Sequence, residues 1–414
     1  MIDVVEAVAP YLERADYKGA LKRALKIESP IRRMIALTEI LTAYSKDEVL
    51  ALMFDALDEI KTTAERALAY SILGRSFYIL NQDRNAELYF ERAMAEVSMV
   101  SSPLLRGEVL AGIARNLVLS DRYEEALGLF REAVELLQAS RGLSAGAVSS
   151  LLKVGRLIER SADEIPNEIA LEFYKLARSV YSSLNFKLQV KYIEEKIELI
   201  NEVLKRGMVV VEDLIRKGEV EVAMSVMRFL PLESRAIAML ELSYWLFLHE
   251  QPKLARKSFE DALEVFFVGK FHVNDAGVES VARRFLRVGF LEEALVLAGI
   301  ISDEKRSSEL LGDIVLAYWR RGETGKARSI LEGIPDEGVK KRVLSFLEGG
   351  KDVGHEQGLP LTGGGEERGA VPEDGGAREV QGEVEQKGGT TVSKGNDSGD
   401  TGDALQLHRA EGAD

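Results

Sequence analysis

The sequence predicts an all-α fold: a right-handed α-solenoid of about eight antiparallel helix pairs, followed by a disordered C-terminal tail. Apolar residues recur at helical spacing through residues 1–348, whereas the alternation typical of strands is scarce there. Prolines fall between the periodic segments, where helices begin or end. They are Pro30, Pro103, Pro166, Pro231, Pro252 and Pro335. A long run of short helices of this kind indicates a repeat array.

One short pattern recurs in four of the predicted helices: Ala, an aromatic residue four positions later, and Ala seven positions later. It occurs as AELYFERA (86–93), ALGLFREA (126–133), ALEFYKLA (170–177) and ARKSFEDA (255–262). This spacing places both alanines and the ring on one helical face. We therefore expect a neighbouring helix to pack closely on that face.

A small residue precedes these segments at a nearly fixed distance. The interval is 12 residues in four cases and 15 in one: Gly74–Ala86, Ala114–Ala126, Ser243–Ala255 and Ala282–Ala294, then Gly155–Ala170. Glycine inside a helix costs about 1 kcal/mol relative to alanine. We therefore expect the second helix of the pair to cross at Gly74, where a larger side chain would push the two helices apart.

This arrangement resembles the tetratricopeptide repeat (TPR) family, in an irregular, archaeal-like form. The matching residues are Tyr70, Leu73, Gly74 and Phe77 with Ala86, Phe90 and Ala93, then Leu110, Ile113, Ala114 and Leu117 with Tyr123, Ala126, Phe130 and Ala133. Weaker units are anchored at Ala20, Val49, Ala294 and Ala327. The period is about 38 residues, longer than the usual 34 of the family. The resemblance implies stacked helix pairs with a concave, peptide-binding groove.

The repeat is interrupted near residues 178–222. Residues 187–207 predict one long helix that ends at a glycine, and 217–230 predict the second helix of a further pair. We therefore predict an N-terminal TPR-like array at 1–207 and a C-terminal TPR-like array at 208–348. The latter should end in a capping helix that begins near residue 337.

The composition changes near residue 348. Residues 349–414 contain 17 of the 36 glycines, and their 14 Asp and Glu against 6 Lys and Arg give −8 of the net −14. Such a segment cannot bury enough apolar surface to offset its chain entropy. We predict a disordered, Gly-rich acidic tail.

No residue pattern supports catalysis. The chain has no cysteine, which excludes thiolate zinc sites and cysteine nucleophiles. The four histidines lack metal-ligand spacing, and His249 is better explained as a residue at a helix end than as a ligand. We predict no enzyme, no catalytic or metal site and no cofactor. The start has no basic segment typical of a signal peptide and no apolar run is long enough to span a membrane, so we expect a cytoplasmic protein without membrane partners.

An arginine follows the small residue in four units: Arg75, Arg115, Arg156 and Arg283. In proteins that the chain resembles, this position faces the concave groove, and a guanidinium suits carboxylates and phosphates. These four are our candidate partner-binding residues. Two alternatives stay open. The arginines could pair with Glu of adjacent helices along a solvated face, and Arg156 could be misaligned by the three extra residues in its unit.

We expect a non-enzymatic scaffold or adaptor that binds a protein or acidic peptide in the concave groove. Self-association stays open. The alternatives from other classes are an enzyme subunit and a regulatory nucleic-acid-associated protein, and either would use a groove site that no recognised motif marks. The net charge of −14 disfavours a nucleic-acid partner.

Overall fold

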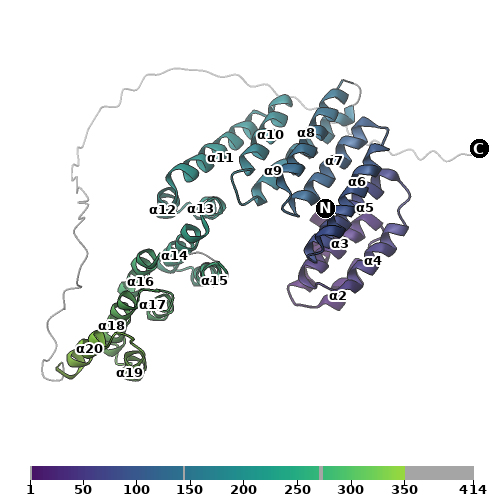
Figure 1. Cartoon of the computed structure of the whole chain (residues 1–414). Coiled ribbons are helices and arrows are strands. Elements are labelled where there is room, and N and C mark those ends of the chain that lie inside the picture. Colours follow the sequence, from purple (N-terminus) through teal and green to yellow (C-terminus); the bar gives the residue numbers. More distant parts are fainter. Residues whose placement is uncertain (1, 143–144, 270–273, 350–414) are drawn as a thin grey trace, which may run out of the picture. The chain divides into compact units, whose positions relative to one another are not determined.

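The structure is a computed structural model that describes residues 2–142, 145–269 and 274–349, and every regular element in these ranges is an α-helix (Figure 1). In chain order the helices are α1 (Ile2–Leu12), α2 (Tyr17–Ala24), α3 (Pro30–Ala43), α4 (Asp47–Asp58), α5 (Thr63–Ile79), α6 (Asp83–Ser98), α7 (Pro103–Val118), α8 (Tyr123–Ser140), α9 (Ala145–Glu164), α10 (Ala170–Ser183), α11 (Lys187–Arg206), α12 (Met208–Arg216), α13 (Val220–Met227), α14 (Leu232–Leu248), α15 (Pro252–Val268), α16 (Asp275–Val288), α17 (Leu291–Ala298), α18 (Glu304–Arg320), α19 (Thr324–Glu332) and α20 (Glu337–Gly349). The all-α prediction is confirmed, and the predicted disordered tail lies outside the described residues except for its first residue.

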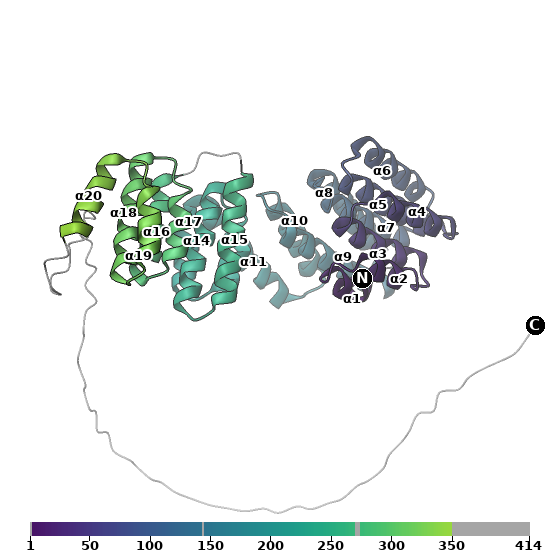
Figure 2. The same ribbon diagram turned by 90° about the horizontal axis from the view of Figure 1, so that it is seen from below.

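Most of these helices form antiparallel pairs of consecutive elements. The pairs are α1/α2, α3/α4, α5/α6, α7/α8, α9/α10, α12/α13, α14/α15, α16/α17 and α18/α19. These nine pairs in the described residues agree with the about eight units that the repeat predicts. The first helices of successive pairs also pack on one another, as in α5–α7–α9 and α14–α16–α18. Figure 1 shows α14, α16 and α18 in one row and α15, α17 and α19 in a second, and Figure 2 shows the same helices from another side.

The repeated small and aromatic residues form the interior between the two helices of a pair. All positions of the Ala–aromatic–Ala pattern in α6, α8, α10 and α15 are buried. Gly74 of α5 is also buried, and a Cβ added to it would lie 3.0 Å from the ring of Phe90 in α6. A Cβ on Gly155 of α9 would lie 2.9 Å from Cγ1 of Val180 in α10. The prediction that the second helix crosses at the small residue is confirmed.

A residue with left-handed backbone stands two positions before the second helix in seven of the nine pairs. These residues are Ala15, Asn81, Asp121, Gly218, Glu250, Gly289 and Gly322. Glycine adopts this conformation freely, Asn and Asp tolerate it, and other residues pay a steric cost. The recurring turn reverses the chain within a few residues and sets the second helix against the first.

Helix α11 interrupts the series of pairs. It spans Lys187–Arg206 and ends at Gly207, whose φ is +61°, which confirms the prediction of one long helix closed by a glycine. It packs on α10, α12 and α13 and belongs to none of the nine pairs. One cluster of buried residues runs from Ala67 to Ala255 across this point, and the division of the chain into two arrays at residue 207 stays a prediction.

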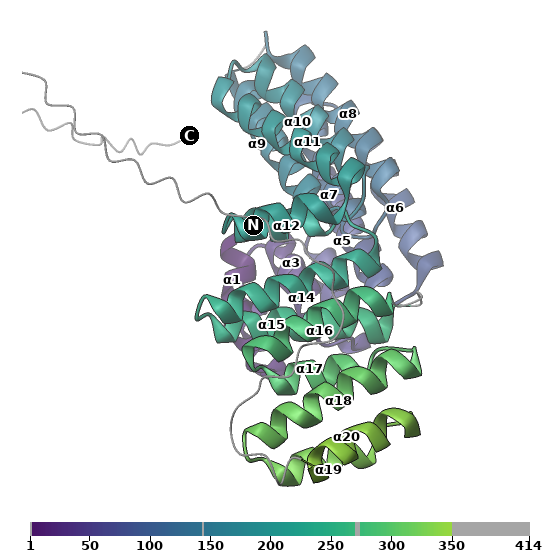
Figure 3. The same cartoon turned by 90° about the vertical axis from the view of Figure 1, so that its left-hand side faces the viewer.

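The last described helix, α20, packs on α18 and α19, as expected for a capping helix (Figure 3). It buries Val339, Val343 and Leu347 and leaves Leu344 and Phe346 exposed. Its inner face therefore closes the core of the preceding pair. The right-handed course of the solenoid stays a prediction.

Candidate functional site

The four candidate arginines lie on first helices, each directly after the buried small residue. Arg75 is on α5, Arg115 on α7, Arg156 on α9 and Arg283 on α16. The first three belong to consecutive, mutually packed first helices, whereas Arg283 belongs to a later run. The structure does not gather the four into a single pocket. Arg75 and Arg115 are near enough to one another that the charges of Arg115 and of its partner Glu164 affect the pKa of Arg75, whereas the carboxylate partners of Arg283 lie on α16 and α18.

Arg75 is held by the preceding first helix, α3. Its Nη2 donates to Oε1 of Glu39 at 3.2 Å, and only 14% of its side chain is exposed. Its Nε is buried without a hydrogen-bond acceptor among the described residues. Burial lowers the pKa of the Arg75 guanidinium, although Glu39 opposes this effect. This guanidinium is therefore already occupied by a carboxylate of the chain itself.

Arg115 and Arg283 are held by the first helix that follows each of them. Arg115 donates to Oγ of Ser161 at 3.3 Å and to Oε1 of Glu164 at 2.5 Å, both on α9. Arg283 donates to Asp313 of α18 at 2.7 Å and to Glu279 of its own helix at 2.9 Å. Burial alone would lower the pKa of Arg283, but its two carboxylate partners together raise it.

Arg156 differs from the other three. Its side chain is exposed, and within the described residues its guanidinium has no hydrogen bond or ion pair. Its charge acts on Tyr181 of α10, which donates to Glu159 at 2.7 Å. Burial and Glu159 raise the pKa of Tyr181, and Arg156 partly opposes them. The extra residues in its unit leave Arg156 on α9 directly after Gly155, in the position that the sequence predicts.

The contacts of the arginine column thus match the alternative interpretation for three of its four members. Arg75, Arg115 and Arg283 pair with carboxylates of neighbouring first helices, as the solvated-face hypothesis expects. A ligand could bind them only by replacing these carboxylates. Arg156 is free to accept an acidic group, so the role of the column in partner binding stays a prediction that depends mainly on this residue.

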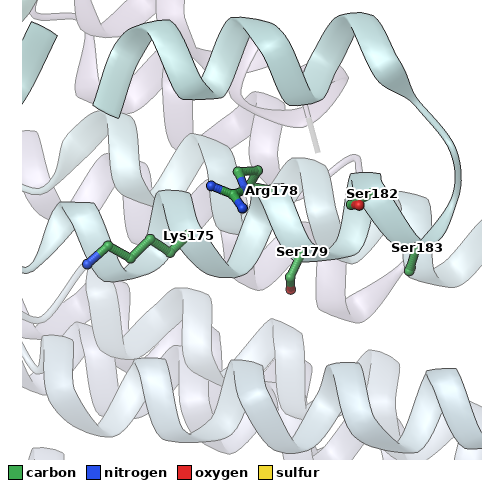
Figure 4. A pocket seen from close by; sticks show the side chains of 5 residues that line it. All are labelled: Lys175, Arg178, Ser179, Ser182 and Ser183. Atoms are coloured by element: carbon green, nitrogen blue, oxygen red, sulfur yellow. The ribbon is translucent and has the colours of Figure 1, made fainter. Parts of the chain in front are cut away.

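A basic depression on α10 is a feature that the sequence patterns did not reveal. It is lined by Lys175, Arg178, Ser179, Ser182 and Ser183 (Figure 4). Its cations are partly neutralised, since Lys175 lies 2.7 Å from Glu172 and Arg178 lies 3.5 Å from Glu194. A second depression shares Ser182 and extends it onto α11. The signal available in the sequence was the group of four lysines and arginines between residues 175 and 191.

The described residues contain no group of three or more His, Asp and Glu side chains placed to hold a metal ion. His249 lies at the end of α14, where its Nδ1 is 2.8 Å from the carbonyl oxygen of Trp245 and its ring stacks on that indole. This is the helix-end placement that the sequence favours over a ligand role. In the part of the chain that the structure describes, no helix is both long enough and apolar enough to cross a bilayer.

No known protein family and no curated protein matches the sequence. Among solved structures, the chain is similar to the crystal structure of Ton1535 from Thermococcus onnurineus NA1, with 25% identity and a TM-score of 0.48 over 83% of this chain and 99% of that chain. It is also similar to a circular tandem repeat protein with novel repeat topology and enhanced subunit contact surfaces, with 17% identity and a TM-score of 0.21 over 84% of this chain and 87% of that chain. The helical-repeat architecture rests on the helix contacts described above, and membership of the TPR family stays a prediction.

Proposed function

We propose that this protein is a non-enzymatic scaffold that binds an acidic segment of a partner protein. One observation carries the proposal. Arg156 is an exposed guanidinium without an acceptor in the described residues, and it lies between the exposed Lys153 and Arg160 on the same helix. Glu159, the carboxylate that lies among these three cations, is already hydrogen-bonded to Tyr181, so the exposed cations favour an acidic ligand.

The stacked helix pairs supply the rigid frame that such binding needs. First helices pack on first helices, and buried alanines and glycines fix their spacing. Side chains on the outer faces are therefore held in a regular array, which suits an extended or helical segment better than a small molecule. Of the four candidate arginines, Arg156 is the one that can bind without first releasing a carboxylate of the chain.

Covalent capture tests the proposal. Because the chain has no cysteine, a single cysteine introduced at Ser149, which is exposed on α9, can carry a photo-cross-linker at one known place. We expect it to capture a defined protein from a native extract, and the purified pair should bind saturably by calorimetry. A cross-linker at Ser98, exposed on α6, is the control. Capture that is identical at both positions, or no saturable binding, would contradict the proposal.

Two further measurements separate this function from its rivals. A scaffold should not retain nucleic acid, so steeply salt-dependent binding to RNA or DNA would favour the nucleic-acid alternative. An enzyme subunit should lose turnover in its complex when a surface carboxylate is replaced. A scaffold should instead lose the partner when Arg156 is replaced.

A further inference from the structure

Successive first helices contact one another through recurring positions, counted from the small residue of each helix. In α5, Leu68 lies six positions before Gly74, and its Cδ2 would be 2.5 Å from a Cβ added to Gly112 of α7. Ser71, three positions before Gly74, accepts a hydrogen bond from Asn116 of α7 at 2.8 Å. These positions of α5 are therefore covered by the next first helix.

The same positions of α7 are covered by α9. Glu108, six before Ala114, accepts a hydrogen bond from Ser150 of α9. Ala111, three before Ala114, and Val118, four after it, are 1% and 4% exposed. Arg115, one after it, is held by Ser161 and Glu164 of α9 as described above. Helix α9 thus covers α7 and supplies the carboxylate that Arg115 binds, as α18 does for Arg283, whereas Arg75 takes its carboxylate from the preceding first helix.

In α9 these positions have no such cover. They are Ser149, Leu152, Arg156 and Glu159, of which Ser149 and Arg156 are exposed and the other two half-buried. Helix α9 packs on α7, α8 and α10, and in the described ranges no further first helix packs on its other side. The reason lies in the chain order, because the next helix, α11, belongs to no pair and packs on α10 instead.

We infer that this open face of α9 is a docking site for an acidic amphipathic helix of a partner protein, which takes the place of the missing first helix. The inference rests on the proposed function and names its site. Elsewhere in the array, the next first helix packs beside each first helix. We therefore expect the partner segment that packs beside α9 to be a helix as well. Its acidic character follows from Arg156 and from the exposed Lys153 and Arg160 that flank it, because Glu159, the carboxylate on this face, is already bound by Tyr181 of α10. A carboxylate of the occupant would bind Arg156 as Glu164 binds Arg115.

Apolar contact is available on the same face and on the neighbouring helix. Leu152 offers a half-buried aliphatic surface on α9. Helix α11 is tied to α9 through Lys196, whose Nζ lies 2.8 Å from Asp163 and 4.7 Å from the ring centroid of Tyr192. Tyr192 is 47% exposed, and Leu188, one turn before it, is 86% exposed. We expect these apolar side chains to pack against the apolar stripe of the docked helix.

The test uses a synthetic amphipathic helix of about 18 residues, or about five turns, with leucines along one face and glutamates beside them. The control peptide has lysine in place of each glutamate. The full chain carries an environment-sensitive fluorophore on a cysteine at position 149, and on position 98 in the control protein. We expect the acidic peptide to bind saturably and to change the fluorescence of the probe at position 149 but not that of the probe at position 98. Binding should weaken as salt is raised from about 0.05 M to about 0.5 M.

Three double variants locate the site. Arg156→Glu with Arg160→Glu should raise the Kd by at least about tenfold, because it removes charge-assisted contacts. Lys253→Glu with Lys257→Glu is the matched control, since these residues are also exposed and four positions apart on α15, and it should leave the Kd within about twofold. Lys175→Glu with Arg178→Glu tests the depression on α10. Circular dichroism should show that each variant remains helical.

Several results would overturn the inference. Binding that is lost only in the Lys175 and Arg178 variant would place the ligand on α10 and leave the proposed function intact. Equal losses in the α9 and α15 variants would indicate nonspecific charge attraction. If the wild type sediments as a dimer and the Arg156 and Arg160 variant as a monomer, the occupant is a second copy of this chain. A complete lack of peptide binding would also refute the inference, whereas the cross-linking experiment judges the proposed function separately.

Discussion

Gly74 and Phe90 are in direct contact across the α5/α6 pair: a Cβ on residue 74 would lie 3.0 Å from both Cδ2 and Cε2 of the ring. The same glycine that weakens α5 as an isolated helix therefore allows the ring of the second helix to lie against its backbone. Gly128 in α8 provides the opposite case, because nothing lies within 4 Å of a Cβ built there. A substitution at Gly74 therefore changes both helix propensity and packing, whereas a substitution at Gly128 changes helix propensity alone.

We predict that Gly74→Leu lowers the free energy of unfolding by about 1–3 kcal/mol, because the new side chain overpacks the helix crossing. Gly74→Ala should be nearly neutral, since a gain of up to about 1 kcal/mol in helix propensity is offset by displacement of the Phe90 ring. Gly128→Ala should raise the free energy of unfolding by that gain in helix propensity, because its Cβ displaces no neighbour. Urea midpoints followed by circular dichroism measure all three. Equal stability of the Leu and Ala variants at position 74 would contradict the crossing.

The left-handed turn residues allow a second prediction. Gly322 has φ +81° and nothing lies within 4 Å of its added Cβ, so Gly322→Ala changes backbone strain alone. We expect a loss of about 1–2 kcal/mol. Glu250 has φ +58° in the equivalent turn before α15, and Glu250→Gly should stabilise the chain by up to about 1 kcal/mol, because strain relief exceeds the entropy cost of glycine. Thermal unfolding gives both values, and effects of the reverse sign would refute the role of these turns.

A third prediction concerns the tyrosine pair around Asp121. Tyr78 donates to Oδ2 of Asp121 at 2.6 Å and Tyr123 donates to Oδ1 at 2.5 Å. The hydrogen bond to the carboxylate, together with burial, raises the pKa of Tyr78 from 10.0 to about 12. Asp121→Asn should return it toward about 10, and Asn suits the left-handed backbone there because Asn81 and Asn185 adopt it in similar turns. Ultraviolet difference titration measures the shift, and Tyr78→Phe identifies the titration step.

A fourth prediction concerns Glu241, a carboxylate of α14 that is only 7% exposed. Arg284 of α16 donates to both of its oxygens, one at 2.6 Å. Burial raises the pKa of Glu241 above its ordinary 4.5 even though Arg284 opposes this, and nearby Glu212 adds to the rise. The folded chain therefore holds this proton more tightly than the unfolded chain. The resulting stabilisation is present below pH 4.5 and is lost as the pH rises through the raised folded value.

The measurement compares Glu241→Gln with the wild type by urea unfolding between about pH 4 and about pH 7. The stability of the wild type relative to the Gln variant should fall as the pH rises. Glu198→Gln, exposed on α11, is the control and should show no such trend. A relative stability that rises with pH would mean that the pairing with Arg284 outweighs burial.

Local residue chemistry was sufficient to predict the helices and their pairing. The Ala–aromatic–Ala spacing and the preceding small residue act within one helix pair, through side chains that are 12 to 15 residues apart. Gly207 marks the end of α11 because a helix commonly stops at glycine. The positions of the four arginines on first helices follow from the same periodicity. All of these features depend on residues that are close together in the sequence, so sequence patterns are enough to predict them.

The state of each arginine was decided by tertiary structure. Arg75 and Arg115 are alike in sequence context, yet their carboxylates come from Glu39, which is 36 residues earlier, and Glu164, which is 49 residues later. No local pattern encodes such partners, because they depend on which helices stack and in what register. The same holds for Arg156, which in the described ranges has no following first helix to supply a carboxylate, because α11 packs on α10 instead. The sequence alone determined where the arginines lie, and only the packing of distant helices decided which of them can still bind a partner.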